Sequence, residues 1–329
     1  MVFNLTYDDD VTIAQINENN NNVYIGLSYV VITSIFMFTQ IMTFIAFYKN
    51  RSVLMINMPY IIISHLGLVD FIQQICHFIS GFYVIFYYFP DSILSYGIAA
   101  LLQCSYMTSV SFILLLSLNR LDVFFDFKII PVFNKKKAFF FGIIICYIWA
   151  IALFIFYMFP SNRLEFISIN YSWNYVGNKT LGFQLENKSV IIMLVISFIC
   201  YLCVIGKIMH MRGLTSGGLV VTLSDIKILL QAMLNFFSIT FLEVSWSNIS
   251  GIITQAGISL MPISYLFIII SGGNTMMNIL FIREVRSEIT NFFTCYTKKN
   301  KDFKDIKVQR MILEKKNKHI FLKAKVLTE

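Results

Sequence analysis

The sequence predicts an all-α integral membrane protein built as a bundle of seven transmembrane helices, with a short amphipathic helix after the last span. Hydrophobic residues make up 57% of the 329 residues and charged residues only 13%, whereas a soluble domain carries about 25% charge. Seven segments are long enough to cross a hydrocarbon layer of about 30 Å, which needs about 20 apolar residues. The basic residues also gather on one side of these segments, as the orientation bias of membrane proteins requires.

The predicted spans follow one another with mostly short connections. They cover residues 23–48, 55–80, 97–125, 138–159, 190–211, 227–247 and 257–282. The polar and acidic residues 1–22 have neither a basic start nor a short apolar core, so we expect an extracellular N-terminal segment and no cleavable signal peptide. Residues 23–282 would form the bundle, and residues 283–329 would form a cytoplasmic amphipathic helix and a basic tail.

Lysine and arginine positions orient the bundle. Lys49 and Arg51 follow the first span while acids precede it, which places the N-terminus outside. Only Arg163, Lys179 and Lys188 then fall outside, which leaves 23 of the 26 Lys and Arg inside. The net charge of +8 therefore reflects topology, and we expect no nucleic-acid partner. We expect a plasma-membrane protein with an extracellular N-terminus and a cytoplasmic C-terminus.

Asn50 begins an Asn-x-Ser/Thr sequence on the predicted inner side, where no sugar would be added. The five other Asn-x-Ser/Thr sequences support this orientation, because such acceptors are glycosylated on the luminal side. They lie at Asn4, Asn170, Asn178, Asn187 and Asn248. Each falls in a segment that the charge pattern places outside, and three share the predicted loop 160–189. The sequence therefore predicts a glycoprotein whose sugars lie on the outer face.

Arg120 lies near the inner end of the third predicted span, in the stretch LLLSLNRLDVFF of residues 114–125. An arginine at the bilayer centre costs about 3 kcal/mol or more on insertion scales, whereas one at a helix end reaches the interface. Asn119 and Asp122 would supply hydrogen bonds to Arg120 in a resting state, which an intracellular partner would break. The alternative is an ordinary cation that anchors the helix at the interface.

The Asn-Arg-Leu triplet at residues 119–121 resembles the inner end of the third helix in seven-helix G-protein-coupled receptors, where acid-Arg-Tyr is usual. The phrase SLNRL, together with HLGLVDFIQQICHFISG at residues 65–81, is similar to nematode serpentine chemoreceptors of the Srg superfamily, in its Srt and Srx branches. The resemblance implies a receptor in a sensory-neuron membrane that signals to a heterotrimeric G protein, alone or as an oligomer. It implies no cofactor and no enzymatic activity.

Asp70 is the only acid well inside a predicted span, where a carboxylate needs a partner or a proton. At about 1.5 Å per residue it lies about 16 Å from the inner surface, and Asn274 lies about 13 Å from the same surface. The two can therefore share one layer. By resemblance to the receptors, Asp70, Asn274 and Asn278 would form a polar cluster that relays a change from outside to inside. The alternative is a structural polar residue.

The outer halves of the third, sixth and seventh spans contain the candidate ligand site. Its residues are Gln103, Tyr106, Met107, Glu243, Trp246 and Tyr265. A cavity lined by aromatic and Met side chains with a few polar groups suits a small organic ligand. The alternative is an aromatic belt with a snorkelling acid at the membrane interface.

The six cysteines show no metal-binding pattern, and none lies in a predicted external loop. Rhodopsin-type receptors tie the outer end of the third helix to the second external loop by a disulfide, but that position is Ser95 here. Packing or sugars would hold the loop instead. The four histidines are scattered, so we expect no metal site. Cys295, on the predicted surface helix, is a palmitoylation candidate, with an unmodified thiol as the alternative.

A transporter or channel for a small solute is the alternative function. Such proteins usually carry several intramembrane charges or interrupted helices, and duplicated halves are frequent, whereas this chain offers Asp70 and no visible repeat. A membrane-embedded enzyme needs clustered acid-base groups, and His65 and His77 are too far apart to converge with Asp70 on one ion. The leading hypothesis is a receptor that binds a small external molecule in the outer half of the bundle.

Overall fold

The computed structural model describes most of the chain. The described residues are 6–86, 90–125, 135–167, 170–175, 181–214, 223–249, 260–292 and 294. Their side chains are described except at residues 6–20, 211–214, 223–225 and 248–249. The chain divides into two compact units, Met1–Phe281 and Ile282–Glu329. Asn4, Asn178 and Cys295 lie outside the described residues.

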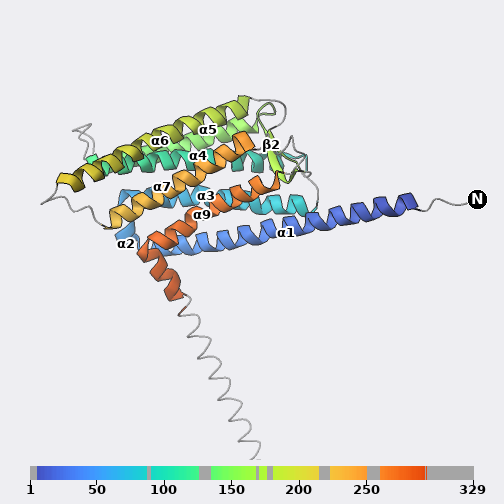
Figure 1. The fold of residues 1–329 in the computed structure, drawn as a ribbon, viewed down its shortest axis with the longest axis horizontal. Helices are drawn as coiled ribbons and strands as arrows, with labels where there is room; N and C mark the ends of the chain where they lie inside the picture. Colours follow the sequence, from blue (N-terminus) through green and yellow to red (C-terminus); the bar gives the residue numbers. More distant parts are fainter. Residues whose placement is uncertain are drawn as a thin grey trace, which may run out of the picture. The chain divides into compact units, whose positions relative to one another are not determined.

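The first unit is a helical bundle with one short antiparallel hairpin (Figure 1). Its elements are α1 (Thr6–Lys49), α2 (Arg51–Leu54), α3 (Met58–Ile85), α4 (Ile93–Phe125), α5 (Lys135–Met158), β1 (Leu164–Ile167), β2 (Ser172–Tyr175), α6 (Leu181–Leu214), α7 (Leu223–Val244), the π-helical turn η2 (Ser245–Ile249) and α9 (Met261–Phe281). Seven helices in the described ranges are long and apolar enough to cross a membrane. The predicted fold class is confirmed.

Five helices start earlier than the predicted spans, and α1 and α6 differ most from the prediction. α1 begins at Thr6, so part of the segment 1–22 continues the first span as one helix. Residues 6–25 contain no Gly or Pro to break it, and acids near a helix N-terminus are favourable for the helix dipole. α6 begins at Leu181 instead of residue 190, which corrects the end of the predicted loop 160–189.

α4 is the central helix of the bundle. It contacts α3, α5, α6 and α7, and Figure 1 shows it running among them. Buried side chains extend along it from Ser95 to Arg120. α5, in contrast, exposes Ile144, Ile148 and Ile155, as a lipid-facing helix does. Because α4 runs the length of the core, it can present side chains at both ends of the bundle and at its middle.

α1 and α3 cross closely at Gly26 and Gly81. A Cβ atom on Gly81 would lie 2.8 Å from Val30 Cγ2 and 2.9 Å from the Gly26 carbonyl oxygen. Small residues permit such an approach where lipid supplies no hydrophobic drive between helices. The absence of a side chain at Gly26 and Gly81 therefore allows α1 and α3 to pack closely.

Gly81→Ala is expected to destabilise the bundle by about 1–3 kcal/mol, because the added methyl group overpacks this crossing. Thermal unfolding of the purified protein measures the effect as a lower Tm. Gly97→Ala is the matched control, since a Cβ there meets no atom within 4 Å. Equal losses of stability in the two variants would contradict the crossing described here.

The hairpin of β1 and β2 caps one end of the bundle, which we call the hairpin end. Trp173 Nε1 in β2 donates a hydrogen bond to Ser80 Oγ of α3 at 2.9 Å. The Tyr171 carbonyl accepts hydrogen bonds from the Ser264 hydroxyl of α9 at 2.8 Å and from the Tyr29 hydroxyl of α1 at 3.3 Å. The hairpin is therefore tied to three helices that are distant in the sequence.

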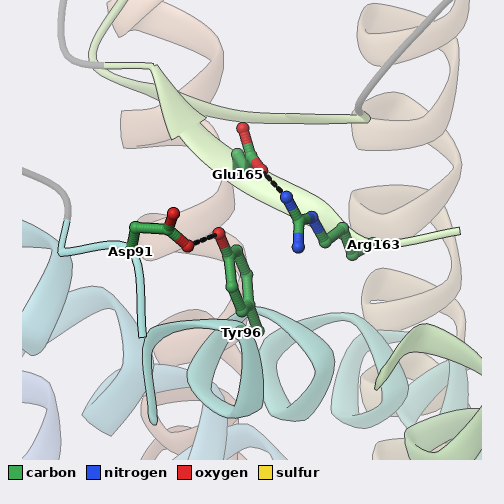
Figure 2. A network of polar contacts seen from close by, with 4 residues as sticks. All are labelled: Asp91, Tyr96, Arg163 and Glu165. Carbon is green, nitrogen blue, oxygen red and sulfur yellow. Dashed lines mark hydrogen bonds and ion pairs between the residues drawn. The ribbon is translucent and has the colours of Figure 1, made fainter. Parts of the chain in front are cut away.

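Figure 2 shows a further connection, between the start of the hairpin and α4. The Arg163 guanidinium lies 4.0 Å from the centroid of the Tyr96 ring and pairs with Glu165 Oε1 at 2.8 Å. The Tyr96 hydroxyl donates a hydrogen bond to the Asp91 carboxylate. Tyr96 adjoins Ser95, which occupies the position where rhodopsin-type receptors have the cysteine that ties the third helix to the second external loop. The stacked arginine thus joins the same two segments without a covalent bond.

Arg163→Ala is expected to loosen the hairpin, since a cation–π contact contributes about 0.5–2 kcal/mol. Hydrogen exchange of the backbone amides in β1 and β2 should become faster, by up to about 30-fold if exchange follows local opening. Arg163→Lys keeps the charge and should show a smaller increase. Unchanged exchange in Arg163→Ala would show that the contact does not hold the hairpin.

The second unit contains a helix over residues 283–292. Val285, Ile289 and Phe292 recur along it at helical spacing, with Arg283 and Arg286 interspersed. The predicted helix after the last span is therefore present. Its location on the inner leaflet stays a prediction.

Candidate functional site

A cavity of about 40 Å³ lies beneath the hairpin. Gln103, Tyr106 and Trp246 line it, as predicted for the ligand site. Tyr106 and Trp246 each set their rings edge-on to Phe267, with centroids 5.4 Å and 5.8 Å apart. β2 closes the cavity with Trp173. The hairpin end thus contains a small enclosed site with mostly aromatic walls.

Glu186 lines this cavity, and a second buried acid, Glu243, does not line it but is hydrogen-bonded to the wall residue Tyr106. Tyr106 donates a hydrogen bond to Glu243 Oε2 at 2.8 Å, and Tyr175 donates one to Glu186 Oε2. Glu186 is 3% exposed and Glu243 is 4% exposed, so Glu243 is not a snorkelling acid at the interface. Among the residues that the structure describes, no Lys or Arg pairs with either carboxylate.

Met107, Glu243 and Tyr265 do not line the cavity, which corrects their predicted positions. Met107 Sδ accepts a hydrogen bond from the Tyr157 hydroxyl at 3.2 Å. Tyr265 bonds Ser28 through its hydroxyl and packs edge-on against Tyr29 at 4.8 Å, on the side of α1. Successive helix residues differ by about 100° in direction, so a correct depth does not fix which side chain faces the cavity.

Sequence reasoning missed Glu186 and His77. Glu186 fell within a segment predicted to be a loop, whereas it lies in α6. His77 was considered only as a metal ligand, and no group of acids, His and Cys in the described residues is arranged to hold a metal ion. The structure places His77 in the wall of the cavity, where its Nε2 atom is buried without a hydrogen-bond partner.

Asp70 joins three helices in the middle of the bundle. Its Oδ1 atom accepts a hydrogen bond from Ser109 of α4 at 2.8 Å, and its Oδ2 atom accepts one from Asn274 Nδ2 of α9 at 2.6 Å. Asn274 Oδ1 accepts in turn from Asn235 Nδ2 of α7 at 2.7 Å. The predicted layer is confirmed for Asp70 and Asn274.

Asn278 belongs to a neighbouring polar pair and not to the Asp70 cluster. It accepts a hydrogen bond from Gln231 Nε2 of α7 at 2.5 Å, one helical turn beyond Asn274. The predicted cluster of three residues is therefore divided between two contacts: Asp70 with Asn274 joins α3 and α9, and Asn278 with Gln231 joins α9 and α7.

A second cavity, of about 180 Å³, lies beside Asp70 and Asn274. Tyr106 and Phe267 line this cavity as well as the one beneath the hairpin. These two aromatic side chains therefore separate the hairpin-end cavity from the Asp70 layer. A shift of either ring would change the shape of both cavities.

Arg120 lies at the opposite end of α4, 1% exposed, beside a cleft of about 500 Å³. The expected resting-state bonds are absent: Asp122 pairs with Lys135 at 3.3 Å, and Asn119 Oδ1 has no partner among the described residues. Neighbouring residues on a helix point in different directions, which explains the correction. Arg120 instead interacts electrostatically with Tyr201 of α6.

Two of the predicted glycosylation sites can be placed with their side chains. Asn170 precedes β2 at the hairpin end, and Asn187 lies half-buried near the start of α6. Asn187 is therefore helical and not part of a loop. The backbone of Asn248 lies in η2, while its side chain is outside the described ones. Modification of these residues stays a prediction.

The seven membrane-spanning helices and their arrangement define a multi-pass membrane protein with the fold of G-protein-coupled receptors. Squid rhodopsin is a solved structure of this class that is similar, with a TM-score of 0.66 and 12% sequence identity. The match covers 84% of this chain and 87% of the rhodopsin chain. No protein-family model and no curated protein sequence matches the chain. The likeness to rhodopsin concerns the fold.

Proposed function

We propose that this chain is a chemosensory G-protein-coupled receptor of the nematode serpentine type, located in a sensory-neuron plasma membrane. It binds a small external molecule beneath the hairpin and signals to a heterotrimeric G protein at its Arg120 end. One observation carries the proposal: α4 presents Tyr106 to the cavity, Ser109 to the Asp70 layer and Arg120 to the cleft. A single rigid helix thus connects a ligand site, a polar middle layer and a surface for a partner.

Ligand binding shifts the bundle only if the ligand has different affinities for two packings. A molecule in the hairpin-end cavity contacts Tyr106 and Phe267, which also line the Asp70 cavity. Repacking of these rings would alter the bonds between Asp70 and Asn274 and hence the fit between α3 and α9. The cleft beside Arg120 would then change shape for its partner.

The orientation in this proposal follows from charge. The hairpin end faces the medium, and the Lys-rich connections beside Arg120 face the cytosol, as the distribution of Lys and Arg favours. Lys135 and Lys136 line the cleft, so the surface that this chain offers to a partner is basic. A basic cytoplasmic cleft suits an acidic surface on a G protein.

Expression in cells that carry a promiscuous G protein tests this function. Screening small odorants and metabolites for calcium responses should yield ligands whose effect requires both the receptor and the G protein. Cells with the empty vector are the control. Ion flux that persists without any G protein would contradict the proposal and support the transporter or channel alternative.

A further inference from the structure

We propose that the ligands of the hairpin-end cavity are small organic cations, protonated amines above all, with Glu186 as the direct counter-ion and Glu243 as a second negative charge beside it. The inference deepens the proposed function and depends on it for its biological meaning. The binding of amines itself is a separate physical statement about the cavity.

The two acidic side chains at the cavity have no basic partner among the described residues. Glu186 and Glu243 come from α6 and α7, are almost fully buried, and act on each other electrostatically. Glu186 accepts a hydrogen bond from Tyr175, and Glu243 accepts one from Tyr106. Gln103, the other polar side chain that interacts with Glu186, is neutral as well. Buried charges in proteins are normally paired, and no Lys or Arg of the described residues supplies that pair. A cation in the cavity would supply it.

His77 is an independent sign that a donor belongs in the cavity. The side chain is 4% exposed, lines the cavity from α3, and leaves its Nε2 atom without a hydrogen-bond partner. In a neutral imidazole this nitrogen can accept a hydrogen bond, and an ammonium group brings three donors. A primary amine therefore has N–H groups for Glu186 and His77 together, which a carboxylate ligand lacks.

The walls and the size of the cavity further limit which ligands can fit. Tyr106, Trp246 and Phe267 present aromatic rings, which attract cations through their faces and accept alkyl groups. A volume of about 40 Å³ holds roughly three waters at about 10–15 Å³ each. As it stands the site therefore suits an amine of about two carbons, and a longer chain such as that of n-butylamine would need the hairpin to move outward.

The test uses three probes with the same four-carbon chain and different charges: n-butylamine, 1-butanol and butyrate. At pH 7 the amine is protonated, as a lysine side chain is. The full-length protein is purified in nanodiscs, and Tm is measured against probe concentration, because a ligand of the native state raises Tm. We expect n-butylamine to raise Tm in a saturable manner, and 1-butanol and butyrate to leave it unchanged or lower it.

Matched variants assign the effect to the two carboxylates. Glu186→Gln and Glu243→Gln keep the side-chain shape and can still accept the tyrosine hydrogen bonds. Each should lower the affinity for n-butylamine by about tenfold or more. Glu186→Asp keeps the charge and should retain the preference for the amine even if affinity falls. Glu284→Gln, in the segment after the last span, neutralises an acid outside the site and should bind as the wild type does.

The outcomes separate this inference from the proposed function. It is overturned if butyrate or 1-butanol stabilises the protein as well as n-butylamine, if no amine from two to six carbons stabilises it, or if both Gln variants bind normally. Stabilisation by amines without any G-protein response would support the cation site and contradict the receptor function. Calcium responses to neutral or acidic odorants alone would support the receptor function and contradict the cation site.

Discussion

Arg120→Ala is expected to abolish ligand-dependent signalling while the protein still reaches the cell surface. The guanidinium is buried beside the cleft at the end of α4, where a partner would bind. Loss of one partner of a buried charged contact costs about 2–5 kcal/mol, which corresponds to about 30-fold or more in coupling. Ligand-stimulated nucleotide exchange on the G protein measures coupling, and surface labelling measures expression.

Two further variants make the Arg120 result interpretable. Arg120→Lys keeps the charge without the planar fork of donors and should retain part of the signal. Lys137→Ala removes an exposed cation near the cleft and should change exchange little. Normal exchange in Arg120→Ala would contradict the coupling role, and loss of both signalling and surface expression would show that Arg120 acts in folding.

Asp70→Asn is expected to uncouple the ligand site from the cleft without loss of ligand binding. The change removes the charge that accepts hydrogen bonds from Ser109 and Asn274, while the shape is kept. Hydrogen bonds to charged groups contribute about 1.5–3 kcal/mol, so a preference between two packings that depends on them should shift by a similar amount. Ligand-stimulated exchange should fall by about tenfold or more at unchanged ligand affinity.

A partner swap tests the contact between α3 and α9 directly. The double variant Asp70→Asn with Asn274→Asp restores one carboxylate and one amide across the same 2.6 Å bond. It should recover part of the exchange that each single variant loses, as coupled residues do in a double-mutant cycle. Strictly additive losses would show that the two residues act separately.

The fold was predictable because membrane insertion depends on composition and length. Seven apolar segments and a one-sided distribution of Lys and Arg suffice to define the number of spans. The helix ends were less predictable, since α1 and α6 continue into polar sequence that hydropathy treats as loop. The hairpin of β1 and β2 escaped prediction because short strands at a helix-bundle end carry little periodic signal.

The candidate sites were predictable in depth but not in rotation. Asp70 and Asn274 were placed in one layer by counting 1.5 Å per residue, which needs no knowledge of direction. Tyr265 lies at the expected depth yet turns toward α1, and Asn278 meets α7. Which face of a membrane helix meets the cavity depends on close contacts such as the Gly26–Gly81 crossing. Such contacts cannot be read from one sequence.

Orientation in the membrane decides whether the cavity can meet external molecules and whether Arg120 can meet a G protein. Epitope tags placed before Met1 and after Glu329 measure it, by antibody staining of intact and permeabilised cells. The N-terminal tag should stain on intact cells and the C-terminal tag only after permeabilisation. Staining of both tags on the same side, or the reverse pattern, would contradict a receptor that binds outside and signals inside.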